Sequence, residues 1–146
     1  MFAKLIFTAA IAVLALTQSG CAVNRAVATA DPSMNWSSIK SLQVLKEEGD
    51  DRGIEKLLAD KLTTQGFVVT VDPQKNPTAD AIVTYVDRWM WDITMYMLEL
   101  TVVVREPKSQ FPLVTGNSFH TSLTRKSPQE MVNEVIDNIM KTRKPQ

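Results

Sequence analysis

The sequence has few of the residues on which enzyme active sites are most often built. Among its 146 residues there is one cysteine, Cys21, and one histidine, His120. A Ser-His-Asp or Cys-His arrangement could therefore use His120 alone, and its polar neighbours predict a half-exposed strand residue. The sequence has no glycine-rich phosphate loop, no His-Glu-x-x-His motif and no clustered Cys/His ligands. We therefore expect a protein that is not an enzyme and needs no cofactor, with an enzyme of unrecognised site as an alternative.

An excess of charge of one sign is also lacking. Sixteen Lys and Arg residues are balanced by sixteen Asp and Glu residues, so the formal net charge is zero. Without a strong field of one sign, nucleic acid is not an expected partner. The N-terminal apolar run, Leu5 to Leu16, is shorter than the roughly 20 residues that a membrane-spanning helix needs. It follows the basic residue Lys4 and has the length of a signal-peptide core, so residues 1–20 are predicted to be a signal peptide.

Cys21 is predicted to be the lipid-modified first residue of the mature chain. The sequence from Thr17 to Ala22, TQSGCA, resembles a bacterial lipobox, with small residues before the cysteine and Gln18 where an aliphatic residue is usual. A lone cysteine cannot form an intrachain disulfide, and acylation explains its presence in an exported chain. Ordinary secretory cleavage after the Ala-x-Ala sequence at 28–30 is the alternative.

The predicted location is the outer membrane, with the domain lipid-anchored and facing the periplasm. Ala22 directly after the cysteine resembles the sorting pattern of outer-membrane lipoproteins in Gram-negative bacteria. Residues 21–35 are expected to be the lipidated cysteine and a flexible tether spanning roughly 20 Å. A protein of the cell envelope is the expected partner, in addition to the membrane itself.

Residues 36–146 are predicted to form a single α+β domain, a two-layer sandwich with a mixed, mostly antiparallel sheet and two helices on one face. Apolar periodicity predicts strands at 38–46, 67–71, 81–90, 95–105 and 113–123, and helices at 52–65 and after 127. Asp50 or Asp51 should cap the first helix, and Ser127 with Glu130 has the pattern of a capping box for the second. In the fifth strand, Gly116 indicates a bulge or a close approach.

The segment from 81 to 104 is the most distinctive part of the chain. It holds two of the three tryptophans, both tyrosines and three of the seven methionines, and it is predicted to be a β-hairpin. Aromatic residues, methionine and arginine are enriched at the cores of protein interfaces. The bend of the hairpin is therefore the predicted interaction surface, and the alternative is that these side chains close one end of the core. The residues of this surface are Arg88, Trp89, Met90, Trp91, Met95 and Tyr96.

A soft-metal site is a second hypothesis for the same hairpin. Trp91, Met95 and Met97 are separated by even numbers of residues, so on a continuous strand they share one face. Thioethers suit Cu(I), and an indole ring can cover a cation. The spacing loosely resembles the Trp/Met/His site of periplasmic copper chaperones, with His120 as a fourth member.

The hairpin and the segment after the fifth strand also carry a family resemblance. YVDRWMWD at 85–92, TMY at 94–96, TG at 115–116 and TSLTRKSP at 121–128 are similar to sequences of small proteobacterial outer-membrane lipoproteins of the domain-of-unknown-function type. The element order resembles the amino-terminal domain of the Tol-system periplasmic protein and the penicillin-binding-protein activator lipoproteins. These resemblances imply an α+β fold and a cell-envelope role, and they supply no catalytic residue.

Overall fold

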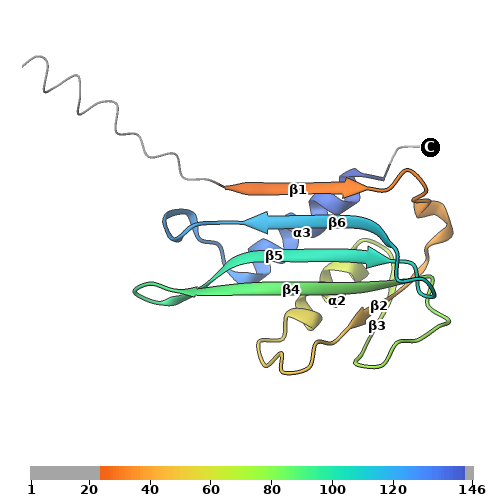
Figure 1. Cartoon of the computed structure of the whole chain (residues 1–146), viewed down its shortest axis with the longest axis horizontal. Helices are drawn as coiled ribbons and strands as arrows, with labels where there is room; N and C mark the ends of the chain where they lie inside the picture. Colours follow the sequence, from red (N-terminus) through yellow and green to blue (C-terminus); the bar gives the residue numbers. More distant parts are fainter. Residues whose placement is uncertain (1–23, 144–146) are drawn as a thin grey trace, which may run out of the picture.

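Six strands form one mixed sheet in residues 24–143, the part of the chain that the computed structural model describes (Figure 1). The sheet order is β1-β6-β5-β4-β2-β3; β2 is parallel to β3 and β4, and the other neighbouring pairs are antiparallel. Both helices cover the same face, which confirms the predicted two-layer α+β class. The elements are β1 (Arg25–Ala30), η1 (Trp36–Ser38), β2 (Ser41–Leu45), α2 (Ile54–Thr64), β3 (Val68–Asp72), β4 (Ala81–Trp91), β5 (Met95–Arg105), β6 (Pro112–Phe119), η2 (Ser122–Thr124) and α3 (Pro128–Lys141).

Helix α3 begins as its sequence predicts. The Ser127 hydroxyl accepts a hydrogen bond from the backbone N–H of Glu130, and the Glu130 carboxylate accepts one from the backbone N–H of Ser127. Pro128, at the first helical position, has no N–H that would need a partner there. The capping box is therefore confirmed, and it fixes the start of the helix directly after η2.

The predicted cap of helix α2 is wrong. Its N-cap residue is Gly53, in the left-handed region at φ +73°, and the helix start has no side-chain cap. Asp50 instead turns toward the sheet, where its carboxylate accepts a hydrogen bond from the Tyr85 hydroxyl at 2.6 Å and another from the Arg52 N–H at 2.9 Å. Burial opposes ionisation of Asp50, but these hydrogen bonds outweigh it and lower the pKa of the carboxyl group. The acid thus joins the loop to β4 rather than capping the helix.

The tether expected at 22–35 contains an edge strand instead. Arg25–Ala30 pairs antiparallel with β6 along its whole length, from Arg25 opposite Phe119 to Ala30 opposite Val114. Ala28 and Ala30 pack against the core, where β1 lies beside α3. Small residues are common in linkers as well as in strands that a helix approaches closely, so composition alone favoured the wrong alternative. The folded part of the chain therefore starts close to Cys21.

Strand β5 has the predicted bounds. Regular alternation would place Tyr96, Leu98 and Leu100 on one face and Met97 and Glu99 on the other, and this expectation is wrong near the hairpin. Pairing with β4 passes from Arg88–Glu99 to Trp89–Met97, so Leu98 is an extra residue on the β5 side. Such a bulge exchanges the faces of the residues on one side of it. Met97 is consequently in the core with Leu100 and Val102, rather than on the open face.

Gly116 allows α3 to lie directly on β6. A Cβ atom at this position would be 2.7 Å from Ile139 Cγ1 and 2.9 Å from Val135 Cγ2. Real carbon atoms do not approach so closely, so any larger residue would push the helix away from the strand. The close approach predicted for this glycine is confirmed, and it positions the α3 residues that face the end of β6.

The predicted signal peptide and the predicted lipidation of Cys21 fall outside the described residues. Within residues 24–143, no helix combines the length and apolar character needed to cross a membrane.

Candidate interaction surface

Exposed apolar side chains gather at the bend between β4 and β5. Trp91 is 70% exposed, Ile93 is 85% exposed and Met95 is 50% exposed, and Met90 has a similar exposure to Met95. Trp91 and Met95 are paired across the two strands, and Ile93 lies between them in the turn. Three of the six residues predicted for an interaction surface are therefore exposed at the bend. Ile93 was not among them, although an aliphatic residue in the middle of a predicted turn is itself a signal.

The other predicted residues of the hairpin are engaged within the protein. Trp89 is partly buried; its Nε1 donates to Asp87 at 2.5 Å, and the Arg52 guanidinium lies 4.4 Å from the centre of its ring. Arg88 is exposed and forms an ion pair with Glu99 at 3.2 Å. Trp89 therefore packs against one end of the core, as the alternative interpretation of the hairpin expected. Met90, Trp91 and Met95 do not, because they are exposed.

A second segment, around η2, is fixed against the hairpin bend by Arg125. Its Nη1 donates to Thr94 Oγ1 at 2.8 Å, its Nη2 lies 3.6 Å from Asp92 Oδ2, and its Cζ lies 4.9 Å from the centre of the Tyr96 ring. Leu123 of η2 is 88% exposed. Together, Met90, Trp91, Ile93, Met95 and Leu123 form what we call the tip surface. Leu123 was predicted to lie in a strand at 113–123, so it was not predicted to belong to this surface. In the structure β6 ends at Phe119, and Leu123 lies in η2.

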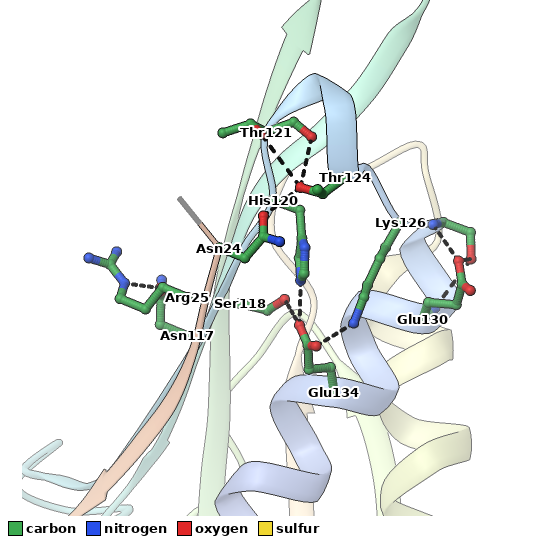
Figure 2. Close-up of polar contacts among 11 residues, drawn as sticks. Asn24, Arg25, Asn117, Ser118, His120, Thr121, Thr124, Lys126, Glu130 and Glu134 are labelled. Carbon is green, nitrogen blue, oxygen red and sulfur yellow. Dashed lines mark hydrogen bonds and ion pairs between the residues drawn. The ribbon is translucent and has the colours of Figure 1, made fainter. Parts of the chain in front are cut away.

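The tip surface also lies next to the first residue that the structure describes. Thr124 Oγ1 donates to Asn24 Oδ1 at 2.5 Å, which connects η2 to the residue preceding β1 (Figure 2). Three segments distant in sequence therefore meet at one end of the sheet: the start of β1, the β4–β5 bend and η2 (Figure 1).

Behind η2, the Glu134 carboxylate connects α3 to β6 and to the loop before the helix. It accepts a hydrogen bond from Ser118 Oγ at 2.6 Å, lies 2.6 Å from His120 Nε2 and forms an ion pair with Lys126 (Figure 2). His120 is buried, so the half-exposed histidine predicted from its neighbours is wrong. Its Nδ1 has no hydrogen-bond partner among the described residues. We call these four side chains the Glu134 network.

The charge of Glu134 is strongly favoured in the folded protein. Partial burial opposes ionisation, but hydrogen bonds from Lys126, Ser118 and His120 outweigh it and lower the pKa of Glu134 from 4.5 to about 2. Ser118 and His120 both contact the carboxylate rather than each other, so His120 is not placed as a base for Ser118. The network therefore fixes the start of α3 and the loop before it against the end of β6.

The four residues of the soft-metal hypothesis have different surroundings. Trp91 and Met95 lie on the tip surface, Met97 is fully buried in the core, and His120 is in the Glu134 network. Among residues 24–143, no three His, Cys, Asp or Glu side chains are grouped so that they could hold a metal ion.

No protein-family model and no curated protein sequence matches this chain. Solved structures with the same fold do exist. PelC from Paraburkholderia phytofirmans, described as a dodecamer, is similar at a TM-score of 0.56 with 14% identity, over 81% of this chain and 96% of PelC. A PDZ domain protein from Parabacteroides distasonis is similar at 0.53 with 8% identity, over 92% of this chain and 39% of that protein. At these identities, the likeness shows the fold alone.

A Tol-system protein is also among the similar structures. TolB from Acinetobacter baumannii overlaps at a TM-score of 0.47 with 12% identity, over 82% of this chain and 32% of TolB. The overlap is too loose to establish a shared fold, so the resemblance of the element order to the Tol-system protein stays a prediction.

Proposed function

We propose that this protein is a non-enzymatic binding or accessory module of the bacterial cell envelope, lipid-anchored through Cys21 to the outer membrane and facing the periplasm. The observation that carries the proposal is the tip surface. Its large apolar side chains are exposed at one end of the molecule, while Arg125 fixes the two segments that bear them. Ordered apolar groups that gather on a surface are typical of interaction sites.

Strand β1 favours lipid anchoring over ordinary secretory cleavage. Cleavage after Ala30 would remove β1, which pairs with β6 and lies beside α3. Losing it would expose the backbone of β6 as a free edge and uncover part of the helix. Cleavage before Cys21 retains the whole strand, and the acyl chains on the cysteine would provide stable membrane attachment.

Mass spectrometry of the protein purified from membranes tests this anchor. We expect the N-terminal peptide to begin at Cys21 with the mass of a triacylated cysteine, and the protein to sediment with outer membranes. The Cys21→Ser variant should appear in the soluble periplasmic fraction with its melting temperature unchanged. An N-terminal peptide beginning at Asp31, or unmodified Cys21 in membrane-bound protein, would contradict the proposal.

A second copy of the chain is the protein partner that we propose. PelC, which has the same fold over nearly its whole length, is described as a dodecamer. The sheet of this chain also leaves one face uncovered by helices, with Val27 and Val86 exposed on it. Sedimentation velocity of the Cys21→Ser variant tests self-association without the anchor. We expect one species of several copies over a wide concentration range, whereas a monomer at every concentration would exclude self-assembly.

A further inference from the structure

The end of the molecule that carries the tip surface is also the end nearest the predicted anchor. Cys21 precedes Asn24 by three residues, and an extended chain covers at most about 3.6 Å per residue, or roughly 10 Å here. Asn24 in turn is bonded to Thr124, next to Leu123 and Arg125. Since β1 begins at Arg25, no long tether separates the anchor from the sheet. A lipid on Cys21 would therefore hold this end at the bilayer surface.

The side chains at this end have the chemistry of a membrane interface. Trp91 presents an amphipathic ring of the kind enriched at the level of lipid headgroups, and Ile93 and Leu123 are apolar groups exposed in the bend and in η2. Arg125 is at the same end of the sheet, where it contacts Thr94 and Asp92 of the bend and its partly exposed guanidinium could also reach lipid phosphates. Basic groups behind an exposed apolar edge are typical of proteins that lie in the interface.

The opposite end of the sheet does not share this arrangement. Strand β5 has 11 residues, so the β5–β6 turn lies about 35 Å from the β4–β5 bend. Phe111 in that turn is 47% exposed. Val68 is exposed at the same end of the sheet, but it lies at the start of the edge strand β3, three places from β5 in the sheet order. The gathering of five large apolar side chains is thus specific to the anchored end.

We propose that the tip surface inserts into the leaflet that holds the acyl chains of Cys21. Trp91, Ile93 and Leu123 enter the interfacial region, and Arg125 lies at the level of the phosphates. The protein is then held at two points, the lipid and the hairpin bend, so the sheet stands at a fixed orientation on the membrane rather than swinging on a linker. This inference rests on the proposed lipid anchor, and it names the bilayer as the partner of the tip surface.

Fluorescence quenching by brominated lipid tests the insertion. The mature acylated protein is reconstituted into vesicles of phosphatidylethanolamine and phosphatidylglycerol, with or without bromine on the acyl chains. Trp36 is buried near the end of α3 and Trp89 is partly buried, so the difference between the wild type and Trp91→Phe isolates the emission of Trp91. We expect bromine to remove most of the Trp91 emission. The Ile93→Ser/Leu123→Ser variant should lose much of this quenching.

The matched control moves the reporter to the other end of the sheet. In the Trp91→Phe background, Phe111→Trp places an exposed tryptophan far from the anchor, and brominated lipid should leave its emission unchanged. Unquenched Trp91 in acylated, vesicle-bound protein would overturn the inference and leave the anchor intact. Trp91 shielded from both bromine and aqueous iodide would also overturn it, because a protein then covers the tip surface. Unmodified Cys21 would instead contradict the proposed function.

Discussion

Replacing Glu134 with alanine is expected to lower the free energy of unfolding by about 2–4 kcal/mol at neutral pH. The carboxylate accepts hydrogen bonds from Ser118 and His120 and pairs with Lys126, so its removal leaves three polar groups without their partner. His120 is buried and cannot turn to water. Urea denaturation followed by circular dichroism measures the loss. Glu134→Gln should cost less, because the amide oxygen still accepts a hydrogen bond.

Glu134→Gln should also remove part of the loss of stability that the wild type shows in acid. The pKa of Glu134 is lowered from 4.5 to about 2 on folding, so the stabilisation by its charge is complete above pH 4.5 and is lost as the pH falls through 2. The wild type should therefore lose stability across this window, and Glu134→Gln should lose less over the same range. Denaturation curves at pH 6, 4 and 2 compare the two proteins.

The control for Glu134 is Glu48, an exposed glutamate in the loop after β2. Glu48→Ala should change the free energy of unfolding by no more than about 0.5 kcal/mol. A loss of that small size for Glu134→Ala would mean that the Glu134 network does not hold α3 on β6. The η2 part of the tip surface would then have to be held by the contacts of Arg125 with the bend and of Thr124 with Asn24.

The elements with strong local signals could be predicted from the sequence. Helix α3 follows from Ser127, Pro128 and Glu130, whose roles depend on neighbours within one helical turn. Strand β5 follows from the alternation of Leu100, Val102 and Val104. The two-layer architecture follows in turn, because two helices with one apolar face each must cover the same sheet face.

Features that depend on distant partners could not be predicted. Strand β1 owes its place to β6, more than 80 residues later, and its own residues carry a weak pattern. The bulge at Leu98 is set by the pairing of β4 with β5 and exchanges the faces of Met95 and Met97 relative to Leu100. Part of the tip surface was predicted, since Trp91, Met90 and Met95 were identified from the sequence. Leu123 is brought to the same end by its neighbour Arg125, which contacts Thr94 of the bend, and no local motif indicates that contact.

Met97→Ala should be among the most destabilising single changes, at about 2–5 kcal/mol, because it removes a fully buried side chain that pairs with Trp89 and packs in the core. Met95→Ala is the matched control, with the same residue type two positions earlier on the same strand. Met95 is 50% exposed, so its loss should cost no more than about 0.5 kcal/mol. Urea denaturation of both variants measures the difference.

This pair of variants also separates the two hypotheses for the hairpin. If Trp91, Met95, Met97 and His120 bound Cu(I), stabilisation of the wild type by Cu(I) under reducing conditions would disappear in Met95→Ala as well as in Met97→Ala. We expect instead that Cu(I) leaves the wild-type melting temperature unchanged, because Met97 is enclosed in the core and His120 is held by Glu134. Met95→Ala should then differ from the wild type in membrane contact, through a weaker bromine quenching of Trp91, and not in stability. Equal destabilisation by the two changes would mean that the hairpin bend is part of the core.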